Sequence, residues 1–66
     1  MKVMINGAAR EVAEGTTVAQ AVRTLTESAT GVAVAVNDEV VTRSAWESTT
    51  LRDSDRVEVL TAVQGG

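Results

Sequence analysis

The chain has 66 residues, of which 44% are apolar, and its nine acidic and six basic residues give a formal net charge of −3. This length allows a single domain, close to the smallest size at which a core holds a fold without disulfides or metal. The chain has no Cys and no His. Their absence excludes a disulfide framework, a thiolate nucleophile and the usual metal ligands, and it argues against a self-contained acid–base enzyme.

Charge and hydropathy also limit the partners. The net charge is negative, and Trp46 is the single aromatic residue, so we expect no nucleic-acid partner. No apolar run approaches the ~20 residues of a membrane span, and the first residues are typical of a strand rather than of a signal peptide. We therefore expect a cytoplasmic protein with no membrane partner.

The first residues predict a β-hairpin. Residues 2–5 have the alternating pattern of a strand and are followed by Asn6-Gly7, the dipeptide that best fits a type I′ turn. We expect the returning strand to run through residues 10–13, with Val12 as its main apolar residue.

The next segment predicts a helix. Thr17, followed three residues later by Gln20, has the pattern of a capping box, and Gly31 is the expected stop signal. Apolar residues recur at spacings of three and four and so form one stripe, which consists of Val18, Ala21, Val22, Leu25 and Ala29. We expect this stripe to cover one side of a sheet, while the opposite face stays in water with Gln20, Arg23, Thr24 and Glu27.

Two strands are predicted after the helix. Residues 32–36 are apolar at every position, which favours a strand covered at least partly on both faces. Asn37-Asp38 then predicts a turn, and residues 39–41 predict a short strand.

The last third of the chain predicts a loop and a final strand. Residues 43–50 lack a clear period, and we expect a loop there with one helical turn, in which Trp46 is an apolar plug. The last strand is expected at residues 56–60. These elements predict an α+β fold, with a mixed sheet of four to five strands packed against one main helix. We expect the domain to cover residues 1–61, with its first and last strands as parallel central neighbours.

Alternation along the strands assigns side chains to the two faces of this sheet. The face covered by the helix is expected to carry Val3, Ile5, Val34, Val36, Val57 and Val59. The other face is expected to carry an apolar docking patch made of Met4, Ala33, Ala35 and Leu60.

Residues 62–66 are expected to form a flexible tail that ends in Gly65-Gly66. Glycine has no Cβ, so such an end can stay extended and thread a narrow channel. The functional group would be the α-carboxylate of Gly66, which is ionised at neutral pH and able to attack the α-phosphate of ATP. About six residues from Thr61, at ~3.3 Å each, would reach ~20 Å into a partner.

The chain resembles the ThiS-type sulfur carriers of thiamine thiazole synthesis, which are small ubiquitin-like β-grasp proteins. The resemblance covers nearly the whole length and is carried by an ordered set of short motifs. These are Ile5-Asn6-Gly7, the helix at 17–25, Ala33-Val34-Ala35-Val36-Asn37, Trp46, Leu51-x-Asp53-x-Asp55-Arg56-Val57-Glu58-Val59 and Val63-Gln64-Gly65-Gly66. Two positions depart from the pattern, because Asp38 and Ser54 stand where such carriers often have Gly at a turn.

The resemblance implies a carrier and co-substrate rather than an enzyme. An adenylyltransferase of the ubiquitin-activating type would use ATP to adenylate the Gly66 carboxylate, which would then become a thiocarboxylate with sulfur from a persulfide enzyme. A thiazole synthase would receive the sulfur. No cofactor or metal would be bound. The residues expected to contact partners are Gly65, Gln64 and Val63 of the tail with Leu60, Met4, Ala33 and Ala35.

Three alternatives remain open from the sequence. The same chemistry could serve another pathway, such as molybdopterin synthesis. The chain could instead be a ubiquitin-like modifier joined through Gly66 to other proteins, although Lys2 is its only Lys and leaves little room for self-polymers. It could also be a plain interaction module whose tail has no task.

Overall fold

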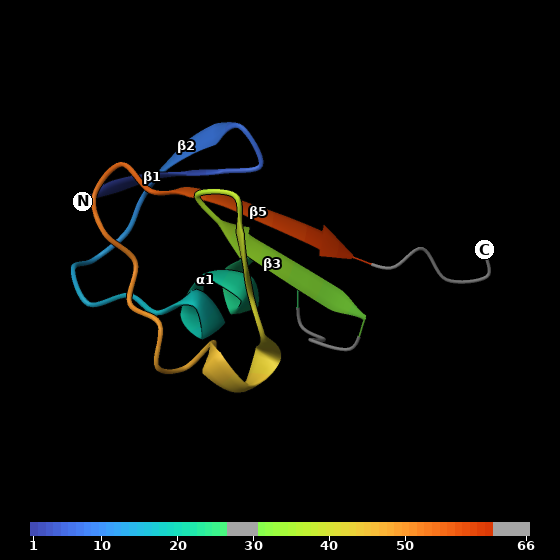
Figure 1. Cartoon of the computed structure of the whole chain (residues 1–66). Helices are drawn as coiled ribbons and strands as arrows, with labels where there is room; N and C mark the ends of the chain where they lie inside the picture. Colours follow the sequence, from blue (N-terminus) through green and yellow to red (C-terminus); the bar gives the residue numbers. More distant parts are fainter. Residues whose placement is uncertain (27–30, 62–66) are drawn as a thin grey trace.

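The computed structural model describes residues 1–26 and 31–61 of the chain. Its elements follow the predicted order (Figure 1). They are β1 (Lys2–Ile5), β2 (Ala8–Glu11), α1 (Val18–Leu25), β3 (Val32–Val36), β4 (Glu39–Val41), the 3-10 helix η1 (Arg43–Ala45) and β5 (Arg56–Thr61). The predicted tail, residues 62–66, lies outside the described residues, as do Glu27 and Ala29.

The first hairpin has the predicted turn and a different second strand. Asn6 and Gly7 both have positive φ, 52° and 82°, as a type I′ turn requires. A two-residue loop makes pairing resume at once, so β2 begins at Ala8 opposite Ile5. The expected strand at 10–13 is therefore wrong in its bounds. Val12 lies beyond β2 and packs, partly buried, against the core.

Helix α1 begins as predicted and ends early. The backbone N–H of Gln20 donates to Thr17 Oγ1 at 3.2 Å, and the Thr17 N–H donates to Gln20 Oε1 at 3.0 Å, which completes the capping box. The helix ends at Leu25, and Thr26 is already extended with φ −150°. Gly31 is thus not the stop signal. Branched Thr24 and Thr26 flank Leu25, and Thr has a low helix propensity.

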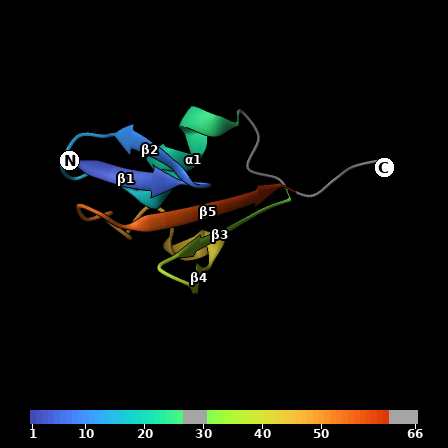
Figure 2. The same ribbon diagram turned by 90° about the horizontal axis from the view of Figure 1, so that it is seen from above.

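The five strands form one sheet in the order β2-β1-β5-β3-β4, which is visible in Figure 2. Strand β5 lies in the middle and runs parallel to β1, with Ile5 opposite Val57. The pairs β1–β2, β3–β4 and β3–β5 are antiparallel. The prediction that the first and last strands are parallel central neighbours is confirmed.

The core lies between α1 and one face of the sheet (Figure 1). Five of the six residues assigned to this face are buried, and Val36 is partly buried. The full buried set is Val3, Ile5, Val18, Ala19, Ala21, Val22, Val34, Trp46, Leu51, Val57 and Val59. Strand β3 is covered mainly on this face, where Val34 is buried, whereas on the other face Ala33 is exposed and Ala35 is half-buried. The prediction that both faces of β3 are at least partly covered thus holds at Ala35 and not at Ala33.

The turns at Asp38 and Ser54 have the left-handed backbone that explains why glycine suits them. Both residues have φ 71°. An L-residue in this region carries a steric cost of roughly 1 kcal/mol that glycine avoids. The two departures from the family pattern are thus positions of local backbone strain.

We expect Ser54→Gly to raise the free energy of unfolding by about 0.5–1 kcal/mol, because it removes this steric cost. Ser54 is exposed, and its backbone N–H, which donates to the Lys2 carbonyl at 2.7 Å, remains in the variant. Urea unfolding followed by Trp46 fluorescence would measure the change. Ser44→Gly, in η1, is the control and should lower stability. A lower free energy of unfolding in Ser54→Gly would contradict the proposed backbone strain at Ser54.

Candidate functional site

Strand β5 carries the chain to the candidate reacting group. It is paired on both sides, and its last residue, Thr61, lies opposite Val32 of β3. In Figure 1 this end of β5 lies away from the N-terminus. The predicted site residues Val63, Gln64, Gly65 and Gly66 lie outside the described residues. The structure therefore shows where residues 62–66 are attached, which is at Thr61, the end of the central strand.

The helix-free face of the sheet carries the predicted docking residues. Leu60 is 68% exposed and lies directly opposite Ala33, which is also exposed. Ala35 lies opposite Glu58 and is half-buried. Residues opposite each other in a sheet share a face, so the predicted assignment of these side chains to one face is confirmed.

Met4 is on the same face but is not beside Leu60. It lies opposite Arg56, at the start of β5. Arg56 and Leu60 are four positions apart along β5, a distance of ~13 Å. The predicted patch therefore divides into Leu60 and Ala33 at the end of β5, Ala35 beside its middle and Met4 at its beginning, because β1 pairs only with the first part of β5.

Val40 is an exposed residue that the sequence reasoning did not include. It is 77% exposed and lies opposite Ala35. Alternation could have found it, because its neighbour Val41 packs against the core. We call the four residues that cross β4, β3 and β5 on this face the apolar strip: Val40, Ala35, Ala33 and Leu60.

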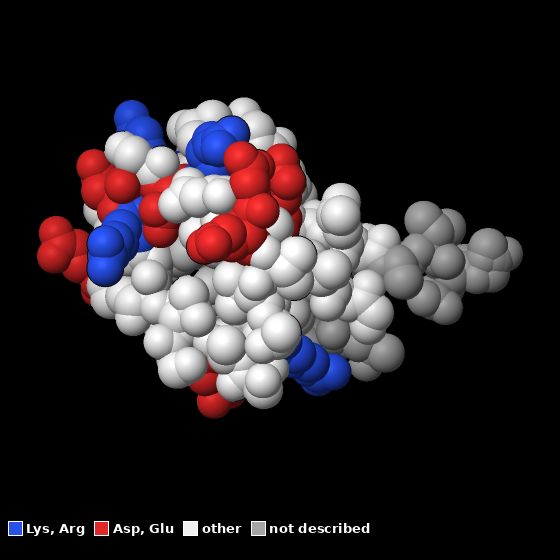
Figure 3. All heavy atoms as spheres, in the orientation of Figure 1, with Lys and Arg blue, Asp and Glu red and all other residues white. Residues whose placement is uncertain are grey.

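Most charged side chains lie on other parts of the described surface, although the exposed Glu58 lies opposite Ala35 on the face of the apolar strip. The Arg56 guanidinium forms an exposed ion pair with Asp38 at 3.0 Å, and Lys2 lies opposite Glu11 in the hairpin. Figure 3 shows most charged groups of this face around the β1–β2 hairpin and the first part of β5, with a few more at the lower edge, whereas the described surface visible at the end of β5 is uncharged. The uncharged end is the one that leads into residues 62–66.

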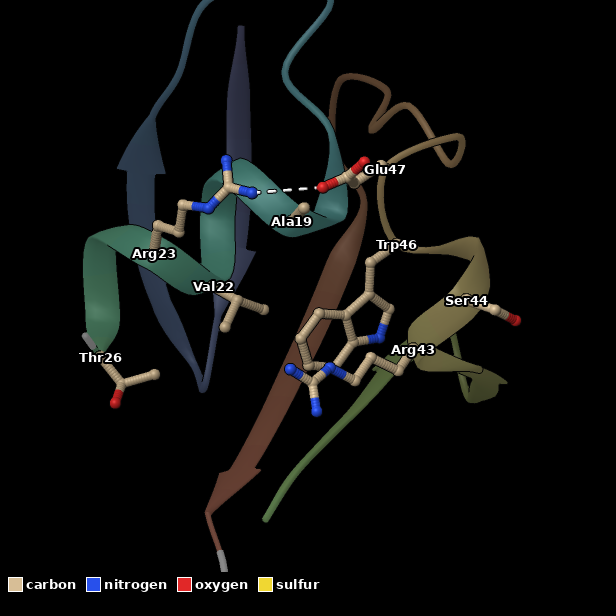
Figure 4. A pocket seen from close by; sticks show the side chains of 8 residues that line it. All are labelled: Ala19, Val22, Arg23, Thr26, Arg43, Ser44, Trp46 and Glu47. Atoms are coloured by element: carbon tan, nitrogen blue, oxygen red, sulfur yellow. Dashed lines mark hydrogen bonds and ion pairs between the residues drawn. The ribbon is translucent and has the colours of Figure 1, made fainter. Parts of the chain in front are cut away.

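A pocket of about 390 Å³ lies between α1 and η1. Figure 4 shows the Trp46 ring in it and the Arg23–Glu47 ion pair, 3.3 Å long, across its rim. Trp46 is 4% exposed, and its Nε1–H donates to the Val41 carbonyl at 3.0 Å. This confirms Trp46 as an apolar plug of the core.

Residues 1–26 and 31–61 contain neither a membrane-spanning helix nor an acidic metal site. None of the helices described there is long and apolar enough to cross a membrane. Within the same ranges, Asp and Glu side chains form no group of three or more that could hold a metal ion.

A comparison with protein families identifies the family of this chain. The model of the ThiS family matches residues 3–66. The chain belongs to the ThiS family. The sulfur carrier protein ThiS of Escherichia coli (strain K12) is 29% identical over 66 residues, which are 100% of each chain.

Solved structures agree with this assignment to the ThiS family. The crystal structure of the thiamine biosynthesis protein ThiS from Geobacter metallireducens has a TM-score of 0.83 and 36% identity, with 100% of both chains covered. An NMR structure of a thiamine biosynthesis protein from the same organism has a TM-score of 0.82 and 35% identity, covering 100% of this chain and 88% of that one. The α+β fold is thus the ubiquitin-like β-grasp fold of ThiS, and this family member is a sulfur carrier rather than an enzyme.

Proposed function

We propose that the C-terminal carboxylate of Gly66 is adenylated, converted to a thiocarboxylate and used as the sulfur donor for thiamine thiazole synthesis. The observation that carries the proposal is the match to the ThiS family, which extends through Gly65-Gly66. The position of β5 adds support, because this central strand stays paired with β3 up to Thr61 and so attaches the following residues to the domain.

The chemistry begins with activation of a poor electrophile. The ionised carboxylate attacks the α-phosphorus of ATP in an adenylyltransferase of the ubiquitin-activating type, and pyrophosphate leaves. The acyl-adenylate then has AMP as its leaving group. Attack by the persulfide of a sulfur-donating enzyme gives an acyl disulfide and AMP, and reduction by a thiol releases the thiocarboxylate. ATP is thus a substrate of the partner, and the carrier itself binds no cofactor.

The composition of the chain fits transfer from the terminus. The chain has no Cys, so no side chain can hold sulfur as a thiol or persulfide. Gly65 would keep the approach to the carboxylate narrow, because it has no Cβ. Gly66 is therefore proposed as the reacting residue, and Gly65, Gln64 and Val63 as the residues that enter the partner's channel.

The apolar strip is the proposed docking surface next to this tail. Its exposed Leu60 and Ala33 lie at the end of β5, where they would meet the rim of the channel that receives residues 62–66. Met4, at the start of β5, would lie at the edge of the same contact.

Intact-mass analysis of the protein purified from its own host tests the proposed chemistry. We expect a fraction of the molecules to be heavier by the difference between one sulfur and one oxygen atom, and alkylation of the thiocarboxylate to shift only this fraction. Covalent attachment of the chain to many cellular proteins, with no such fraction, would instead indicate a ubiquitin-like modifier. Sulfur delivery to a purified molybdopterin synthase but not to a thiazole synthase would contradict the proposed role in thiamine thiazole synthesis.

The docking surface gives a separate prediction. We expect Leu60→Asp to raise the KM of the carrier as a substrate of the adenylyltransferase about tenfold, because a charge replaces an apolar contact at the centre of the interface. Stability should change little, since the side chain is 68% exposed. Steady-state pyrophosphate release would measure KM.

Ala8→Asp is the matched control for this prediction. It adds the same charge at an exposed position of β2, opposite Ile5 and so away from the face of the apolar strip. We expect its KM to stay within about twofold of the wild-type value. Equal increases of KM in both variants would indicate a general charge effect. An unchanged KM in Leu60→Asp would show that the apolar strip does not contact the adenylyltransferase.

A further inference from the structure

Strand β5 is held unequally along its two edges. Strand β3 accompanies it to the end, with Val32 opposite Thr61. Strand β1 pairs with it only as far as Ile5 and Val57, and the last backbone hydrogen bond on this side runs from the Asn6 N–H to the Val57 carbonyl at 2.9 Å. After Asn6 the main chain turns away into β2, so the second half of β5 has no strand of the described residues beside it on this edge.

The side chain of Asn6 takes the place of the missing strand. Its Oδ1 accepts a hydrogen bond from the Val59 N–H at 2.8 Å, and its Nδ2 donates to the Val59 carbonyl at 3.2 Å. A primary amide offers a donor and an acceptor, as a peptide group does. The Asn6 side chain therefore continues the hydrogen bonding along this edge of β5 by one residue. Asp could accept from Val59 but not donate, and Gly would contact neither group.

Asn6 also has to hold the turn from which its side chain reaches β5. Its φ of 52° lies in the left-handed region, which Asn adopts more readily than most residues. Asn is therefore the residue type that satisfies both the type I′ backbone and the two polar groups of Val59. One side chain links the turn of the first hairpin to the last part of the central strand.

We propose that Asn6 is a positioning residue for sulfur transfer, which keeps β5 ordered through Val59 and so presents Leu60, Thr61 and the residues after them to the activating partner. This role rests on the proposed function of Gly66. Without the amide, both polar groups of Val59 lose their partner, and the end of β5 is held by β3 alone. A partner would then have to order Leu60 and Thr61 on binding, and ordering backbone carries an entropic cost.

Asn37 provides a matched control at the other end of β5. It too has a left-handed backbone, with φ 51°, and its side chain also binds β5. Its Oδ1 accepts from the Arg56 N–H at 3.0 Å, and its Nδ2 donates to Asp55 Oδ1 at 2.9 Å. Asn6→Gly and Asn37→Gly each keep a residue suited to the turn and remove one amide from β5.

The test measures hydrogen exchange and steady-state kinetics on both variants of the full chain. We expect Asn6→Gly to speed exchange of the Val59 amide about tenfold while the buried helix amides of α1 keep their rates, and Asn37→Gly to speed exchange at Arg56 instead. With the adenylyltransferase, Asn6→Gly should raise KM about five- to tenfold at unchanged kcat, because the loss concerns binding and not the chemical step. The KM of Asn37→Gly should stay within about twofold.

Several outcomes would overturn the positioning role. Equal increases in KM for the two variants, or faster exchange throughout the core in Asn6→Gly, would show a general effect on stability. An unchanged KM with fast exchange at Val59 would show that the order of β5 does not affect binding. If Asn6→Gly does not fold, Asn6→Asp, which keeps the acceptor for the Val59 N–H, should raise KM by a smaller factor, and an unchanged KM would refute the role. Absence of adenylation in the wild-type chain would refute the proposed function itself.

Discussion

Deletion of Gly65 and Gly66 is expected to abolish sulfur transfer and to leave the free energy of unfolding within about 0.5 kcal/mol of the full-length value. The physical reason is the separation of the reacting end from the described core. Val59 is the last buried residue along the described chain, and strand β5 ends at Thr61. Transfer is measured as thiocarboxylate formation by intact mass after reconstitution with the adenylyltransferase and a persulfide donor, and stability as urea unfolding.

Replacement of Gly66 by Trp tests the same group without shortening the chain. We expect no thiocarboxylate, because a bulky side chain beside the reacting carboxylate would not enter a channel that fits glycine. Glu14→Trp, at an exposed position outside the proposed contact, is the control and should retain most of the transfer, since it adds the same side chain but keeps both glycines. Normal transfer by either the deletion or Gly66→Trp would refute the tail mechanism.

Trp46→Ala is expected to unfold the domain. Truncation of a buried Trp costs about 3–5 kcal/mol, and a domain of this size is stabilised by a similar amount, about 3–5 kcal/mol. Trp46 is 4% exposed, and its loss would also leave the Val41 carbonyl without its 3.0 Å indole donor. Circular dichroism would follow the fold, because the variant has no Trp left for fluorescence.

Two variants calibrate this result. Trp46→Phe keeps much of the ring volume but has no N–H, so we expect an intermediate loss of about 1–3 kcal/mol. Ser44→Ala, at an exposed position of η1, should change stability by less than about 0.5 kcal/mol. A Trp46→Ala protein with the thermal midpoint of the wild type would contradict the role of Trp46 in the core.

Local sequence signals predicted the features that depend on neighbouring residues. Asn6-Gly7 forms the expected type I′ turn, and Thr17 with Gln20 forms the expected capping box. Alternation along β5 placed Val57 and Val59 in the core and Leu60 on the other face. These predictions hold because backbone preference and strand period act over two to four residues.

The features that the sequence reasoning missed depend on distant residues. Leu51, which we did not predict to lie in the core, is buried, because its backbone N–H binds the Thr16 carbonyl at 2.8 Å and brings the loop against α1. The separation of Met4 from Leu60 follows from the short parallel pairing of β1 with β5. Gly31 marked no helix end, because α1 stops at Leu25.

The sequence by itself determined the elements, the two faces of the sheet, the ThiS family and the lack of any Cys that could hold sulfur. Only the tertiary structure decided which residues meet across the sheet. Asn6 and Val59 are 53 positions apart, and nothing in the local sequence of either residue indicates the other. The physical reason is that pairing between strands distant in the chain is fixed by packing of the common core, so the residues beside the functional end of β5 are chosen by register and not by local propensity.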